Sequence, residues 1–300
     1  MRNCLLTCIS MIVALVAGAS LAQADPLCRM GTPGETAPLS LSDGRVVQLH
    51  LPREATGRLP LVFVLHGSGS SAKGVLADSK LAAEADASGF ALVAPDAAIP
   101  LGDGYAWNIP GVPTVSGKVP GPEVPDDVAH ILTTIDTLVE AGCVDPARVY
   151  VTGISGGGRM TSWLGCVAAD RFAAIAPVVG LRAGNPLESD PTRPDPATCR
   201  PDAPLSVLAF AGDKDTVNPV EGGGAGYWQY SMDAALARWA ALDGCTEGPR
   251  RFDFTGKLLV TAYGECQDGT SVTGWVYHGR GHEWVADNHA MWRFFERHHR

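Results

Sequence analysis

Short runs of apolar residues alternate with amphipathic segments along most of the chain. The apolar runs predict strands, because a strand that is buried on both faces of a sheet has few polar positions. The predicted strands cover residues 45–52, 59–65, 90–94, 148–152, 173–179, 205–210 and 273–277. Between them, apolar side chains recur at three- and four-residue spacing, which is typical of one helix face. The predicted helices cover residues 78–87, 128–139, 159–169, 232–242 and 288–298.

Strands that alternate with helices predict βαβ units and a mostly parallel sheet with helices on both faces, an α/β fold. No internal repeat and no second core are visible in the sequence, so we expect one domain. Residues 99–125 interrupt the pattern as a Gly/Pro-rich stretch without periodicity, and a loop of this length in a compact domain is usually functional. His130 is expected on the polar side of the helix that follows.

The first 24 residues have the pattern of an export signal. Arg2 precedes an uncharged apolar run over 5–21, and a small-x-small cleavage pattern ends at Ala24. A membrane anchor is the alternative, but an apolar run of this length is at the lower limit for crossing a bilayer. We therefore expect a signal peptide over 1–24, a folded domain over 25–300, and a secreted protein, extracellular or periplasmic, without stable membrane insertion.

Charge and cysteine content limit the classes of binding partner and cofactor that we expect. The chain has 23 Lys and Arg against 32 Asp and Glu, a net charge of −9, and no run of basic residues, which argues against nucleic acid. Six cysteines remain after the predicted signal, which carries Cys4 and Cys8, and in an oxidising compartment six cysteines fit up to three disulfides in 15 connectivities. The closely spaced cysteine pairs of a zinc site are missing from this set, so we expect neither a metal nor another cofactor.

The pattern Gly153-x-Ser155-x-Gly157 lies between a predicted strand and a predicted helix. A tight strand-to-helix turn lifts a serine hydroxyl above the sheet, and glycines flank it because a Cβ would collide with the turn. The motif alone is weak evidence in a chain with 35 glycines. It becomes informative only if a base and an acid follow at the right places.

A nucleophilic serine needs a base, and the base needs an orienting acid, which follow the serine in the order acid, then base, in folds with this motif. Asp213 and Asp215 both follow the strand at 205–210. We favour Asp215, which lies far enough beyond the strand to reach over the sheet edge, and expect Asp213 to cap the loop. Among eight histidines, His282 lies in a glycine-flanked loop after the last strand, whereas His278 is still close to that strand.

Acyl transfer also needs hydrogen-bond donors where negative charge develops, each worth about 3 to 4 kcal/mol. The backbone N–H groups of Gly156 and Ser68 are the predicted donors. Ser68 follows the strand at 59–65 in the sequence His66-Gly67-Ser68. The alternative interpretation of His66 and Gly67 is a plain strand-to-loop turn.

Taken together, these motifs resemble the α/β-hydrolase esterases of the polyhydroxybutyrate depolymerase and feruloyl esterase family. The resemblance extends from about Val46 to Trp284. The matching segments are LVFVLHG (61–67), WN (107–108), PDDVAHILTTIDTL (125–138), VDPARVYVTGISGGGRM (144–160), AAIAPVVG (173–180), AGDKD (211–215) and GRGHEWV (279–285). It implies an α/β-hydrolase fold that works without a cofactor.

The resemblance also implies roles for individual residues. The implied nucleophile, acid and base are Ser155, Asp215 and His282, and the implied substrate-binding residues are Trp107, Asn108 and Trp284. The disulfides implied by the resemblance are Cys245–Cys266, Cys166–Cys199 and Cys28–Cys143. Trp107 and Trp284 are expected to line an aromatic cleft.

The implied function is that of a secreted serine esterase, which hydrolyses feruloyl- or acetyl-type esters of plant polysaccharide through an acyl-enzyme. Its expected partner is a small or oligomeric ester. The alternative is a depolymerase of polyhydroxybutyrate or hydroxyalkanoate oligomers. An interpretation of another class is a catalytically idle scaffold that binds a ligand.

Overall fold

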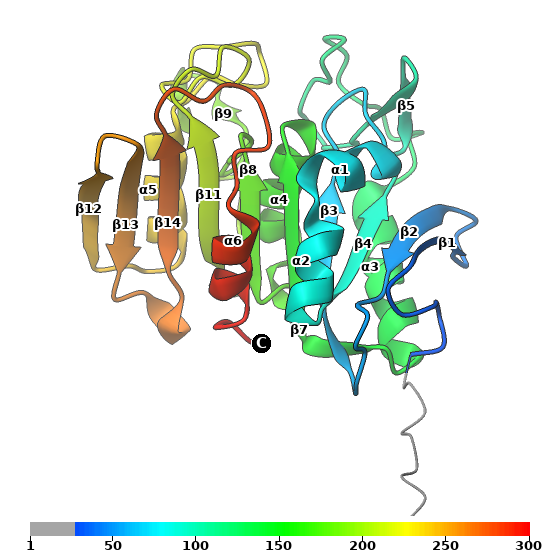
Figure 1. The fold of residues 1–300 in the computed structure, drawn as a ribbon. Helices are drawn as coiled ribbons and strands as arrows, with labels where there is room; N and C mark the ends of the chain where they lie inside the picture. Colours follow the sequence, from blue (N-terminus) through cyan, green and yellow to red (C-terminus); the bar gives the residue numbers. More distant parts are fainter. Residues whose placement is uncertain (1–27) are drawn as a thin grey trace, which may run out of the picture.

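The structure, a computed structural model, describes residues 28–300. A ten-stranded sheet runs through the molecule (Figure 1). In sheet order its strands are β1 (Thr36–Ser40), β2 (Val46–His50), β4 (Ala91–Pro95), β3 (Leu59–Leu65), β7 (Val144–Ile154), β8 (Ala174–Val178), β11 (Ser206–Gly212), β14 (Val272–Tyr277), β13 (Leu258–Gly264) and β12 (Glu247–Phe254). The predicted signal peptide over 1–24, with Cys4 and Cys8, lies outside the described residues.

The middle of the sheet is parallel and its two ends are antiparallel. The strands from β4 to β14 in this order pair in parallel, whereas β1 and β2 extend one end and β13 and β12 the other in antiparallel pairs. Parallel strands place their carboxyl ends at one edge of the sheet, where ligands bind in open α/β sheets. The loops that follow β11 and β14 rise at this edge, at the top of Figure 1.

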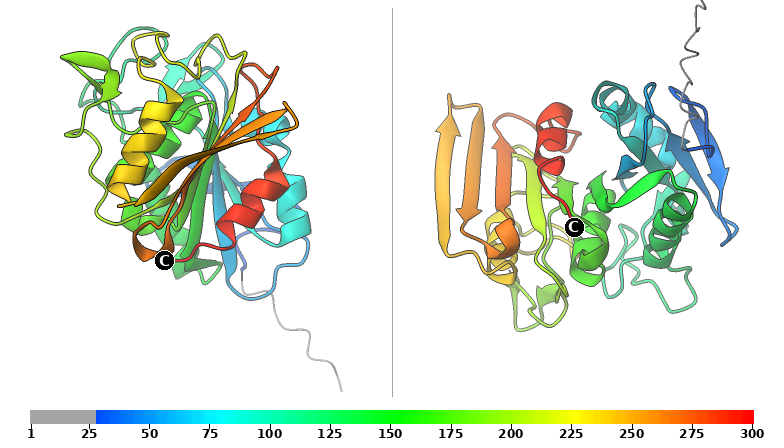
Figure 2. Two further views of the ribbon diagram at one scale, coloured as in Figure 1. Left: turned by 90° about the vertical axis from the view of Figure 1, so that its left-hand side faces the viewer. Right: turned by 90° about the horizontal axis from the view of Figure 1, so that it is seen from below.

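Helices cover both faces of the sheet (Figure 2). The helices are α1 (Ala72–Ser79), α2 (Leu81–Ser88), α3 (Asp127–Glu140), α4 (Gly156–Val167), α5 (Met232–Leu242) and α6 (Asn288–Phe295), with short 3-10 turns at Ala169–Arg171 and Gln267–Gly269. One face carries α1, α2 and α6, and the other carries α3, α4 and α5. This architecture confirms the expected single-domain α/β fold.

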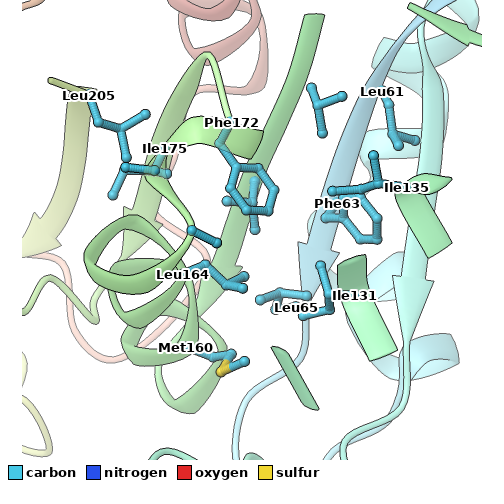
Figure 3. Close-up of a cluster of buried hydrophobic side chains, with 14 of the residues drawn as sticks. Leu61, Phe63, Leu65, Ile131, Ile135, Met160, Leu164, Phe172, Ile175 and Leu205 are labelled. Atoms are coloured by element: carbon cyan, nitrogen blue, oxygen red, sulfur yellow. The ribbon is translucent and has the colours of Figure 1, made fainter. Parts of the chain in front are cut away.

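The larger core cluster lies between the sheet and α3 to α5. Phe63 and Leu65 of β3 are fully buried and lie beside Ile131 and Ile135 of α3 (Figure 3). The apolar positions of the predicted helix at 128–139 therefore do face the sheet, as their spacing indicates. Within residues 28–300, no helix combines the length and apolar character needed to cross a bilayer.

Several predicted elements differ from the observed ones. The helix predicted at 78–87 is wrong in its extent: α1 begins after Ser71, whose side chain accepts a hydrogen bond from the Gly74 N–H. Lys80 then adopts a left-handed conformation (φ 55°) that separates α1 from α2. Sequence periodicity does not register such a break, because a lysine gives no warning of positive φ.

The segment at 99–125 contains regular structure, since β5 (Ile99–Leu101) and β6 (Gly104–Ala106) form a hairpin. A second hairpin joins β9 (Pro186–Leu187) and β10 (Asp190–Pro194). The expectation for His130 is wrong: its side chain is buried, and its Nδ1 lies 2.6 Å from an oxygen of Asp43. The partner comes from a loop that precedes the helix by more than 80 residues.

Candidate active site

Ser155 stands at a sharp turn between β7 and α4. Its backbone has φ 56° and ψ −113°, a conformation that non-glycine residues rarely adopt and that is typical of functional turns. A Cβ on Gly153 would lie 2.6 Å from the Gly157 carbonyl oxygen, and one on Gly157 would lie 2.1 Å from the Leu65 carbonyl oxygen. Both glycines are therefore required by close backbone approach, which is the geometry that the motif predicted.

Three side chains from separate strand ends meet at this turn. The Nε2 atom of His282 lies 2.8 Å from the Ser155 Oγ, and its Nδ1 lies 2.7 Å from a carboxylate oxygen of Asp215. Because a carboxylate only accepts hydrogen bonds, Nδ1 carries the proton and Nε2 is left to accept from the serine hydroxyl. This is the geometry of a nucleophile, a base and an orienting acid.

Asp215 is held firmly in this position. Its side chain is buried, and its second oxygen accepts hydrogen bonds from the backbone N–H groups of Val217 and Asn218, both at 2.8 Å. Asp213, the alternative acid, instead accepts from His278 and from the Gly279 N–H. The structure thus brings Asp215, and not Asp213, to His282.

The predicted oxyanion donors lie side by side. A Cβ on Gly156 would be only 3.0 Å from the backbone nitrogen of Ser68, so the two peptide N–H groups occupy one small region next to the serine. Gly156 is the first residue of α4, whose N-terminal N–H groups have no acceptor within the helix. Two adjacent donors at a helix N-terminus suit a developing oxyanion.

His66 fixes the orientation of the Ser68 donor, a role that the sequence did not reveal. The buried His66 accepts a hydrogen bond at Nε2 from the Ala97 N–H, so its Nδ1 carries the proton and donates to the Gly67 carbonyl at 2.8 Å. Burial lowers the pKa of His66 and keeps the ring neutral. In a trans peptide the C=O and N–H point in opposite directions, so the Ser68 N–H points away from His66.

The three predicted substrate-binding residues differ in their contacts. Trp107 is 4% exposed, and its indole N–H donates to the His66 carbonyl at 2.7 Å. It lines a small cavity together with Ser68 and Gly156, and its contact with substrate stays a prediction. Asn108 ties its loop to the start of α3 by donating to the carbonyls of Val124 and Pro125. Trp284 is half-buried and packs on the opposite core cluster from Trp107.

Three disulfides brace the domain, and they are the pairs implied by the family resemblance. Cys166–Cys199 joins the end of α4 to the segment before β11, and Cys245–Cys266 closes the β12–β13 hairpin region. Cys28–Cys143 fastens the first described residue to the segment between α3 and β7. None of the three includes a residue of the serine turn itself, and each of them joins segments of the scaffold.

Comparison with known proteins agrees with the site. Residues 46–189 match the model of the family described as "Esterase PHB depolymerase". The matched segment is similar to this esterase family. The match covers the serine turn and the Ser68 loop, whereas Asp215 and His282 follow it in the sequence.

Two curated relatives carry esterase names. A protein of Nocardia uniformis subsp. tsuyamanensis that is named as an esterase is 31% identical over 241 residues, 70% of this chain and 64% of its own length. Feruloyl esterase B of Piromyces equi is 29% identical over 197 residues, 64% of this chain and 33% of its own length. This chain therefore spans less than two thirds of the length of both relatives.

Solved structures show the same fold. The acetyl xylan esterase from Aspergillus awamori superposes with a TM-score of 0.62 at 14% identity, over 87% of this chain and 99% of that one. At this identity the likeness concerns the fold alone, and it confirms the predicted α/β-hydrolase architecture.

Proposed function

We propose that this chain is a serine esterase that hydrolyses carboxylic esters through an acyl-enzyme on Ser155. The observation that carries the proposal is the continuous hydrogen-bonded series from Ser155 through His282 to Asp215, at 2.8 and 2.7 Å. His282 takes the serine proton as Oγ attacks the ester carbonyl, and Asp215 stabilises the resulting imidazolium. The N–H groups of Ser68 and Gly156 hold the oxyanion in each tetrahedral intermediate.

The second half of the reaction uses the same groups. His282 donates its proton to the departing alcohol, and the acyl group remains on Ser155. The histidine then removes a proton from water, whose oxygen attacks the acyl carbonyl. As the bond between the acyl carbon and the Ser155 Oγ breaks, His282 returns this proton to Oγ and the free acid leaves. Every proton passes through Nε2, so the proposed reaction needs no group beyond the side chains and N–H donors already described.

For the substrate, we propose feruloyl- or acetyl-type esters of plant polysaccharide as the first candidate, supported by the name of the Piromyces equi relative. Hydroxyalkanoate oligomers are the second candidate, supported by the description of the matching family. The three disulfides and the predicted signal peptide support secretion. A panel of methyl ferulate, acetylated xylan and hydroxybutyrate oligomers separates these classes.

The experiment that tests catalysis itself is covalent labelling. A fluorophosphonate probe reacts with an activated serine, so the intact protein should acquire one adduct on Ser155 and hydrolyse p-nitrophenyl acetate. Ser155→Ala should lose both properties, and His282→Ala should label far more slowly. An unlabelled wild-type protein that is folded would instead identify a binding scaffold.

A further inference from the structure

Arg159 is a buried cation next to the proposed nucleophile. It is 6% exposed and lies one helical turn after Ser155, about 6 Å along the axis of α4. Helical side chains lean toward the helix N-terminus, which directs its guanidinium back toward the serine turn. The Nη2 atom accordingly donates to the Ser68 Oγ at 3.3 Å, and the ring of Tyr227 stacks 4.1 Å from the guanidinium carbon.

The charge of Arg159 has no acidic counterpart. No ion pair joins Arg159 to a carboxylate anywhere in residues 28–300, and its Nε is buried without a hydrogen-bond partner. Burial lowers the pKa of Arg159 to about 10, and the like charge of Arg182 acts in the same direction. Arg159 is nevertheless protonated at neutral pH. An unpaired buried charge is costly, so its presence beside a reactive serine calls for an anion that arrives with the ligand.

Arg182 is a second buried arginine in the same region, and its guanidinium has carbonyl acceptors. It donates to the carbonyl oxygens of Tyr227 and Gly184, and its guanidinium lies 4.3 Å from the ring of Tyr230. These contacts fasten the loop before α5 to the segment after β8, which is a structural task. Arg159 lacks carbonyl partners of this kind in the described chain, where its hydrogen bond goes to a serine hydroxyl.

A small cavity extends from Arg159 away from the serine. Asn185 and Arg182 line it together with Arg159, and the Asn185 Oδ1 is also buried without a partner. A side-chain amide carries both an acceptor oxygen and a donor nitrogen, so Asn185 can accept or donate a hydrogen bond. Ser68, Gly156 and Arg159 also line a second small cavity together. The guanidinium thus lies between the oxyanion donors and a pocket with unused polar groups.

We propose that Arg159 binds a free carboxylate of the substrate, so that the preferred substrates are short esters with a carboxylate a few bonds from the scissile carbonyl. The inference rests on the proposed esterase function. The distance of one helical turn between Ser155 and Arg159 sets the short spacing. Hydroxyalkanoate oligomers end in such a carboxylate, whereas feruloyl and acetyl esters of neutral sugars have none. Carboxylate binding by Arg159 therefore favours the second substrate candidate, the hydroxyalkanoate oligomers, over the first.

The test compares each acid with its uncharged partner. Two pairs place the carboxylate on either side of the ester: the 3-hydroxybutyrate dimer against its methyl ester, and monoethyl glutarate against ethyl valerate. The wild type should prefer the acid in at least one pair by about ten- to hundredfold in kcat/KM, the range expected for a charge-assisted hydrogen bond. In Arg159→Met this ratio should fall to about one, whatever the absolute rates. Arg159→Lys, which keeps the charge but loses the planar donors, should give an intermediate ratio.

Arg171→Met is the control, because it removes a guanidinium that pairs with Asp136 and lines neither cavity, and it should leave the ratio unchanged. A wild type that hydrolyses p-nitrophenyl acetate but prefers neither acid overturns the inference and leaves the proposed function standing. Loss of rate in Arg159→Met by the same factor on acid and ester also overturns it, because Arg159 then acts on the oxyanion or on the fold. If Arg159→Met does not fold, the wild-type ratio and Arg159→Lys still decide. A wild type without any esterase activity refutes the proposed function itself.

Discussion

The His66 side chain offers a direct test of how the oxyanion site is organised. His66→Gln places an acceptor where Nε2 stood, so it keeps the bond from the Ala97 N–H but loses the donation to the Gly67 carbonyl. His66→Asn places an N–H where Nδ1 stood, so it keeps the donation to Gly67 and loses the contact with Ala97. Both variants lose the ring that packs 4.9 Å from Trp107. The pair therefore separates orientation of the peptide from packing.

The expected loss of kcat in His66→Gln lies between two limits. The Gly67 carbonyl also accepts a hydrogen bond from the Ser70 N–H at 3.1 Å, so the peptide keeps one of its two restraints in His66→Gln. A neutral hydrogen bond contributes about 1 kcal/mol, which sets a lower limit of about fivefold on the loss in kcat. Complete loss of the Ser68 donor would cost about 100- to 1000-fold, which sets the upper limit.

The assay is kcat for p-nitrophenyl acetate, with thermal unfolding measured in parallel to establish that both variants are folded. We expect His66→Gln to lose at least fivefold more in kcat than His66→Asn, while the two unfold at similar temperatures. Equal kcat values in the two variants would refute the idea that His66 orients the Ser68 N–H. The histidine would then serve only to fill the core beneath the turn.

Two further substitutions address the acid and the stability of the fold. Asp215→Asn should lower kcat by about four orders of magnitude because the imidazole loses the partner that fixes its tautomer, whereas Asp213→Asn should change kcat by less than tenfold. Asp243→Asn should change how stability depends on pH, since burial raises the pKa of Asp243 to about 7. The folded state then holds a proton that the unfolded state releases near pH 4. Its stabilising effect is complete below pH 4 and is lost as the pH rises through 7, so urea unfolding should show Asp243→Asn gaining up to about 3 kcal/mol on the wild type between pH 4.5 and pH 8.

Each of these expectations has a clear counter-result. Similar losses in Asp215→Asn and Asp213→Asn would mean that the two carboxylates share the role. A stability difference between Asp243→Asn and the wild type that stays constant from pH 4.5 to pH 8 would show that Asp243 does not titrate in this window.

The central features of the site could be predicted because local rules place them. Ser155 lies in a turn whose glycines are demanded by backbone approach, and Asp215 and His282 follow strands that end at the same edge of the sheet. Strand position, chain order and turn chemistry are all visible in sequence. Asp215 lies two residues farther beyond the strand than Asp213, and this difference was the reason to favour it. The structure places Asp215 against His282.

The features that escaped prediction depend on contacts between distant segments. Arg159 lies on a helix where a charged residue normally faces solvent, and it is buried because the loop carrying Tyr227 folds over it. His130 is covered by Asp43 in the same manner. The hydrogen bond from the Trp107 indole N–H to the His66 carbonyl likewise joins segments that lie far apart in the sequence. The sequence does contain one signal for Arg159. It follows the serine by four residues, and residues four apart lie on the same face of a helix.

The separation of the reacting groups along the chain has a consequence for folding. The nucleophile follows β7, but the acid and the base follow β11 and β14, and these strands join the sheet through β8. A folding intermediate that has assembled only the strands up to β8 would hold a formed serine turn without its partners. Recovery of ester hydrolysis during refolding would therefore report the docking of the last two parallel strands, a late event set by long-range contacts.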